Sequence, residues 1–240
     1  MIDQDQMNPS TNSVPPPVPV DEQPRDTGNL VADLLKNPLR VARMIAAEPE
    51  GLLNASFGLL AVALVCHAIF GAAIGLFAGW HVALIDVAKA PLIALCSLLL
   101  CFPSLYVFSC VAGSPLTLLQ TFALGCSCQA MVGLLLIGLA PVGWLFAVST
   151  ASLPFIVVLA FAVWFVAIVF ADRYVEKLKA VHLFSSQAGI KTWLVILVIV
   201  SLQMTTCMRP LLGTSGKGVL AGEKMFFLAH FVSVFDASAK

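Results

Sequence analysis

No Asp, Glu, Lys, Arg or His occurs between residues 90 and 171. A charged side chain at the centre of a bilayer costs about 2.5 to 3.5 kcal/mol on insertion scales. A soluble helix, by contrast, needs a polar face, which this stretch does not provide. The composition agrees with burial in lipid, because only 11% of all residues are charged, against roughly 25% in soluble domains. The sequence therefore predicts a chain that crosses a membrane several times.

Apolar runs long enough to cross a hydrocarbon core of about 30 Å predict five transmembrane helices. They are expected at residues 55–79, 90–111, 116–139, 155–171 and 192–208. Segments 81–89 and 140–154 read as polar or interfacial links, and segment 172–191 reads as a charged loop. Pro103 lies inside the second run, where it predicts a kink. The predicted fold is all-α: a bundle of five transmembrane helices with flanking amphipathic helices.

The remaining segments are predicted to flank the transmembrane domain, residues 51–210. Residues 1–28 are rich in Pro and poor in apolar side chains, so a disordered tail is expected. Residues 29–50 place leucines opposite basic residues, which favours helices in the headgroup layer with a break at Asn37-Pro38. In residues 211–240 the spacing of Phe and Val predicts another amphipathic helix.

The distribution of Lys and Arg predicts the orientation. With five spans, more of these residues fall on the side of the N-terminus and of segment 172–191 than on the other side. Cytoplasmic loops carry the excess of positive charge. The N-terminus is therefore expected in the cytoplasm and the C-terminus outside.

Candidate structural or functional polar residues are His67, Gln129, Gln203 and Arg209. His67 lies mid-span, where a histidine can relay protons, bind a metal or haem, or hydrogen-bond to a neighbouring helix. Gln129 is expected to hydrogen-bond to another helix. Arg209 either reaches the headgroups or caps the carbonyl end of the fifth span and anchors the tail helix. No catalytic residue, metal site or cofactor is predicted, and the cysteines are interpreted as small apolar side chains.

Gly71, Gly75 and Gly79 recur at four-residue spacing in the first expected span. This spacing places small residues on one helix face, where a second helix can approach closely. The face predicts packing within the chain, with homodimerisation as the alternative.

Several short motifs run from the second span to the C-terminus. They are PSLYVF at 103–108, GSPLTLLQ at 113–120, QM at 203–204, MRPLLG at 208–213 and EKMFF at 223–227. With these motifs the chain resembles bacterial Yip1-like multi-pass membrane proteins over roughly residues 30 to 235. The resemblance implies an inner-membrane protein and supplies no catalytic residues. The Asp-Leu-Tyr-Gly-Pro signature of eukaryotic Yip1 proteins is absent, so no small-GTPase partner is implied.

Two functions compete on this sequence. A non-catalytic scaffold or accessory subunit, contacting the lipid bilayer and other membrane proteins or itself, is favoured by the glycine face, the amphipathic flanks and the lack of an acid within the spans. A small-molecule or ion transporter or channel gains if His67, Gln129 and Gln203 converge on one water-accessible cavity. An enzyme is disfavoured because no Gly-x-Ser-x-Gly, paired-Asp or His-Glu-x-x-His pattern occurs. The formal net charge of zero argues against nucleic-acid binding.

Overall fold

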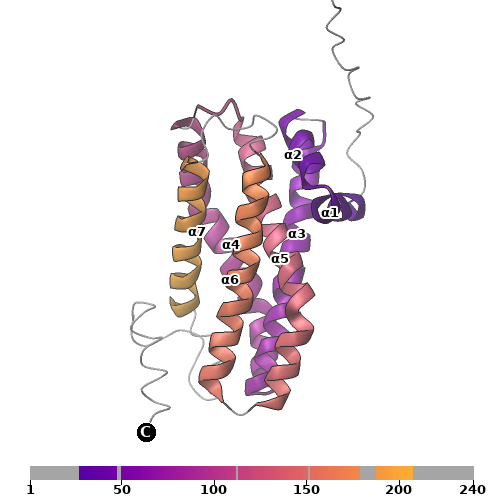
Figure 1. The fold of residues 1–240 in the computed structure, drawn as a ribbon, viewed down its shortest axis with the longest axis vertical. Coiled ribbons are helices and arrows are strands. Elements are labelled where there is room, and N and C mark those ends of the chain that lie inside the picture. Colours follow the sequence, from indigo (N-terminus) through magenta and orange to yellow (C-terminus); the bar gives the residue numbers. More distant parts are fainter. Residues whose placement is uncertain (1–26, 48–49, 112, 151, 179–187, 208–240) are drawn as a thin grey trace, which may run out of the picture.

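The computed structural model describes residues 27–47, 50–111, 113–150, 152–178 and 188–207, which form a bundle of helices (Figure 1). The helices are α1 (Thr27–Lys36), α2 (Pro38–Ala47), α3 (Leu52–Gly75) with the short 3-10 helix η1 (Leu76–Ala78), α4 (Trp80–Val111), α5 (Leu118–Ser149), α6 (Leu153–Leu178) and α7 (Ala188–Cys207). Four stretches in these ranges are long and apolar enough to cross a membrane: Leu52–Ala78, Trp80–Val111, Leu118–Ser149 and Pro154–Lys177. The all-α prediction is confirmed for these ranges, and four rather than five of the helices have the length and apolar composition of a membrane span. α7 contains a shorter apolar stretch, Lys191–Thr205.

The long helices extend through segments that the sequence analysis assigned to links. Residues 81–89 belong to α4, because the turn is made at Gly79, whose φ is 108°, and α4 begins at the next residue. Residues 140–149 belong to α5, which continues through Pro141. A proline is tolerated in a membrane helix when neighbouring groups satisfy the backbone. Residues 172–178 continue α6, where Tyr174 is buried and Arg173 is exposed.

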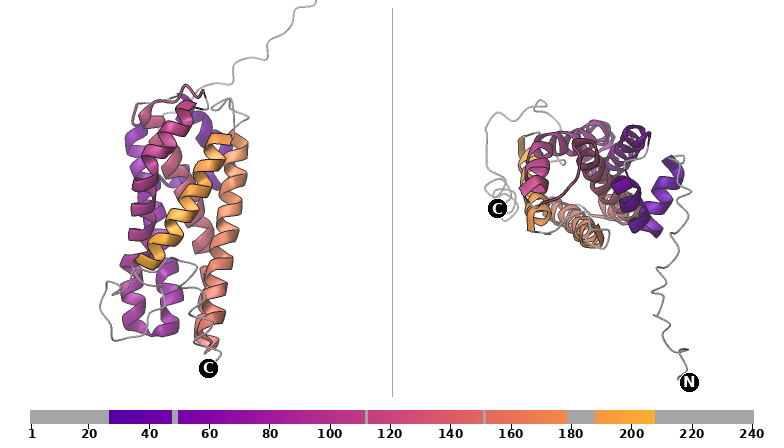
Figure 2. Two further views of the ribbon diagram at one scale, coloured as in Figure 1. Left: turned by 90° about the vertical axis from the view of Figure 1, so that its left-hand side faces the viewer. Right: turned by 90° about the horizontal axis from the view of Figure 1, so that it is seen from above.

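α3 packs against both α4 and α5, which also contact one another, and it lies on the side of the bundle that carries α1 and α2 (Figures 1 and 2). α7 packs mainly on α4, and α6 packs mainly on α5. A Cβ atom at Gly133 of α5 would lie 3.1 Å from the carbonyl oxygen of Ala63 in α3, so the small residue lets these two helices approach closely. The pairs α4–α7 and α5–α6 therefore stand on two sides of α3.

α1 and α2 lie on the outside of the bundle near one end, at the top in Figure 1. They are separated at Asn37, as the sequence predicts. Their apolar side chains, including Leu34 and Ile45, are buried in the same core as residues of α3 and α5. The side-chain amide of Gln120 in α5 also donates a hydrogen bond of 3.0 Å to the carbonyl oxygen of Ala46. Most of the apolar face that suggested a helix in the headgroup layer is thus covered by protein, whereas Leu35 is exposed.

α7 is fixed on α4 by Trp193, whose side chain is fully buried. Its indole N–H donates a hydrogen bond of 2.8 Å to the carbonyl oxygen of Cys101, which also accepts from the Ser104 hydroxyl at 2.7 Å. At the beginning of α7, Nζ of Lys191 lies 2.8 Å from Oε1 of Glu176 in α6. The start of α7 and the end of α6 therefore lie at the same end of the bundle.

Candidate functional site

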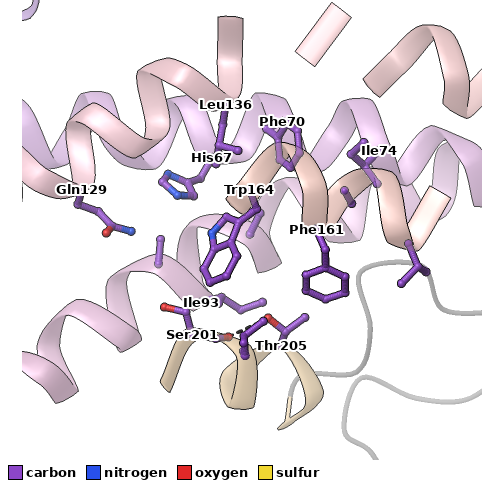
Figure 3. Close-up of a pocket in the computed structure, with 15 residues that line it drawn as sticks. His67, Phe70, Ile74, Ile93, Gln129, Leu136, Phe161, Trp164, Ser201 and Thr205 are labelled. Atoms are coloured by element: carbon purple, nitrogen blue, oxygen red, sulfur yellow. Dashed lines mark hydrogen bonds between the residues drawn. The ribbon is translucent and has the colours of Figure 1, made fainter. Parts of the chain in front are cut away.

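A cavity of about 120 Å³ lies between the helices, and every long helix contributes to its wall (Figure 3). The lining residues are His67, Phe70 and Ile74 of α3, Ala90, Ile93 and Ala94 of α4, Gln129 and Leu136 of α5, Val157, Ala160, Phe161 and Trp164 of α6, and Ser201, Leu202 and Thr205 of α7. Most of these side chains are apolar, and a few polar groups converge among them. This combination is typical of ligand sites between the helices of bundles.

His67 contributes a polar group to the cavity from α3. Its side chain is 7% exposed, and Nδ1 lies 2.7 Å from the carbonyl oxygen of Ala63, one helical turn earlier. A carbonyl oxygen can only accept a hydrogen bond, so we assign the proton to Nδ1. In the neutral imidazole Nε2 is then an acceptor. His67 therefore brings a hydrogen-bond acceptor to a largely apolar cavity.

Gln129 contributes an amide from α5, and it is 7% exposed. Its side chain makes no hydrogen bond to another described residue, and Figure 3 shows it reaching into the cavity. An amide that has no partner within the protein and faces a cavity can hydrogen-bond to a bound molecule or to water. Gln129 thus offers both a donor and an acceptor to a ligand.

α7 contributes two hydroxyl groups, those of Ser201 and Thr205, one helical turn apart. The Thr205 hydroxyl donates a hydrogen bond of 2.8 Å to the carbonyl oxygen of Ser201. Phe161 and Trp164 of α6 place aromatic rings in the same cavity (Figure 3). The cavity therefore has polar groups on α3, α5 and α7 and aromatic groups on α6.

Two of the predicted polar residues meet here. His67 and Gln129 line one cavity, whereas Gln203 lies in α7 and is not among the lining residues. Ser201 and Thr205 were missed by the sequence analysis, although their four-residue spacing in an apolar helix is a signal for one shared face. Arg209 and the predicted C-terminal helix lie outside the described residues.

Asp86 is a buried acid that the sequence analysis assigned to a link. It lies in α4 with 0% exposure, and neither carboxylate oxygen has a hydrogen-bond partner among the described residues. Nζ of Lys89, one turn further on, lies 3.9 Å from Oδ1. Asp86 therefore belongs to a helix of membrane-spanning length, because α4 begins earlier than predicted. Asp86 is one helical turn from Ala90, which lines the cavity.

Of the three glycines in the predicted face, two pack against α4 and the third makes a turn. A Cβ at Gly71 would lie 2.6 Å from the carbonyl oxygen of Asp86, and one at Gly75 would lie 2.8 Å from Cα of Ala83. Both glycines thus let α3 contact the backbone of α4. Gly79 lies beyond the helix in the turn, where a Cβ would meet nothing within 4 Å.

Within the described ranges, no three His, Cys, Asp or Glu side chains come close enough together to hold a metal ion. Comparison of the chain with protein-family models, with curated proteins and with solved structures finds no match.

Proposed function

We propose that this chain is a non-catalytic protein of the bacterial inner membrane that binds a small molecule within the bilayer and carries it across. The observation that supports this proposal is the cavity in which His67, Gln129 and Ser201 meet from three helices. Ionisable residues such as His67 within membrane-spanning helices are rare and mark substrate pathways. A cavity bounded by several helices also gives a site whose walls can move relative to one another.

A scaffold or accessory role loses support from the same contacts. Gly71 and Gly75 are used within the chain, against α4, so this face is not available to a partner helix. The apolar sides of α1 and α2 are buried on the bundle. Asp86 adds an acid to a helix of transmembrane length. The glycine face and the N-terminal amphipathic helices are thus used within the chain, whereas the predicted C-terminal helix lies outside the described residues.

The carrier proposal includes five spans, with α7 as the fifth. α7 has 20 residues, which at about 1.5 Å per residue give about 30 Å, the thickness of a hydrocarbon core. An odd number of spans, combined with the distribution of Lys and Arg, puts the N-terminus in the cytoplasm and the C-terminus outside. This arrangement agrees with the Yip1-like resemblance of the sequence.

The topology predicts that reporters fused to the two ends of the chain respond on opposite faces of the membrane. A reporter that is active only in the cytoplasm should work at the N-terminus, and one that is active only outside should work at the C-terminus. Reporters responding on the same face would contradict the fifth span and leave the four longer stretches unaffected.

The carrier function predicts that water reaches the cavity from one side of the membrane. In the Ser201→Cys variant, a membrane-impermeant thiol reagent added to vesicles should modify the new cysteine from one face, above the background of the native cysteines. Ser97→Cys is the matched control, because Ser97 is fully buried and lies outside the cavity wall. Ser149→Cys, at an exposed helix end, reports that the reagent is active. Modification of Ser149→Cys without modification of Ser201→Cys would contradict the carrier function.

A further inference from the structure

The hydrogen-bonding groups of the cavity restrict the chemistry of what it can hold. Nδ1 of His67 is committed to the carbonyl oxygen of Ala63 at 2.7 Å, which leaves Nε2 as an acceptor. An acceptor in an apolar cavity is satisfied by an N–H or O–H of the bound molecule. A ligand whose polar atoms are all acceptors offers Nε2 no donor and therefore forgoes this hydrogen bond.

Gln129 adds a second requirement, which is a hydrogen-bond acceptor on the bound molecule. Gln129 is 7% exposed as a whole, its side chain has no hydrogen-bond partner among the described residues, and its amide faces the same cavity as His67 (Figure 3). The amide NH₂ needs an acceptor. A hydroxyl group both donates and accepts, so one hydroxyl can donate to Nε2 of His67 and accept from the amide of Gln129.

The remaining wall restricts size and charge. The space of about 120 Å³ is partly open to the outside of the bundle, and it is of the order of a cavity of about 150 Å³ that holds benzene, so it admits at least one such ring. Phe70, Phe161 and Trp164 supply aromatic surface, and no Asp, Glu, Lys or Arg belongs to the described lining. A charged ligand would thus enter an apolar cavity without a countercharge, which is strongly unfavourable.

We propose that the cavity binds a small, neutral, mainly apolar molecule with one hydroxyl group, held between His67 and Gln129. This inference rests on the proposed function, because it names the class of molecule that the carrier takes.

Phenol and toluene are suitable probes, since they share a ring and differ by a hydroxyl in place of a methyl group. Binding is measured by equilibrium dialysis of the full chain in detergent, and empty micelles serve to correct for partition of the probes into the detergent. Both probes should bind saturably, and phenol should bind about tenfold more tightly than toluene. That factor is about 1.4 kcal/mol, within the range of one intramolecular hydrogen bond. The Ala160→Phe variant, which places a ring in the cavity, should bind neither probe.

The variants that test the assignment are His67→Leu and Gln129→Leu, each of which should abolish the preference for phenol while toluene still binds. His81→Leu is the matched control, because His81 is exposed and stacks on Trp80 outside the cavity. Equal affinities of the folded wild-type protein for the two probes would overturn the hydroxyl inference and leave the carrier proposal standing. Absence of saturable binding of either probe would overturn the inference on size and class, whereas the carrier proposal is decided separately by labelling of Ser201→Cys.

Discussion

The Lys89→Met variant is expected to lose at most about 3 to 5 kcal/mol of unfolding free energy, the typical cost of removing one partner from a buried ion pair, because a desolvated carboxyl group can take up a proton instead. Asp86 has 0% exposure and no hydrogen-bond partner among the described residues, so Lys89 at 3.9 Å is the compensating charge that the structure places beside it. Methionine keeps most of the length of lysine and removes the ammonium group. The free energy is measured by SDS titration of the purified protein in mixed micelles.

The double variant Asp86→Asn/Lys89→Met is the matched control for this effect. It removes both charges with little change in volume, and replacing both partners of a buried pair is often neutral or stabilising. We therefore expect its stability to be close to that of the wild type. Asp86→Asn alone should cost less than Lys89→Met, because a lysine side chain can extend toward the headgroups. A Lys89→Met protein as stable as the wild type would show that the carboxyl group needs no countercharge.

Asp86 and Lys89 also explain why the sequence analysis placed the helix ends incorrectly. It treated each charge as a mark of solvent, and therefore assigned residues 81–89 to a link. Charges at positions i and i+3 of a helix face one another and can enter the protein as a pair. The composition of a segment does not reveal whether its charges are paired, so the beginning of α4 could not be found from the sequence. The apolar character of the adjoining helices could be found, because it depends on local composition alone.

The candidate site, like the helix ends, was predictable from the sequence only in part. His67 and Gln129 stand out because a polar residue in an apolar helix needs a partner. Ser201 and Thr205 do not stand out in the sequence, because a small hydroxyl group can hydrogen-bond to its own helix, as that of Thr205 does. Which polar residues share one cavity depends on how the helices are rotated and paired, and packing across distant parts of the chain determines this. The sequence therefore supplies candidates, and the structure supplies their convergence.

The packing of α3 on α4 depends on the absence of a side chain at Gly71. A Cβ there would lie 2.6 Å from the carbonyl oxygen of Asp86 and 2.8 Å from Cβ of Ala90. The first neighbour is a backbone atom, which no rotamer change can move aside. An added methyl group must therefore push the two helices apart. Because Ala90 lines the cavity, this displacement also alters the cavity wall.

The Gly71→Ala variant is accordingly expected to lose about 1 to 3 kcal/mol of unfolding free energy, the usual cost of overpacking. Gly138→Ala is the matched control in α5, since a Cβ there would meet nothing within 4 Å. Alanine is the better helix former by about 0.8 to 1 kcal/mol in water, so the control should be neutral or slightly stabilised. The same SDS titration measures both variants. If Gly71→Ala and Gly138→Ala behave alike, close approach of α3 and α4 does not hold the bundle together, because a methyl group inserted between their backbones would then cost nothing.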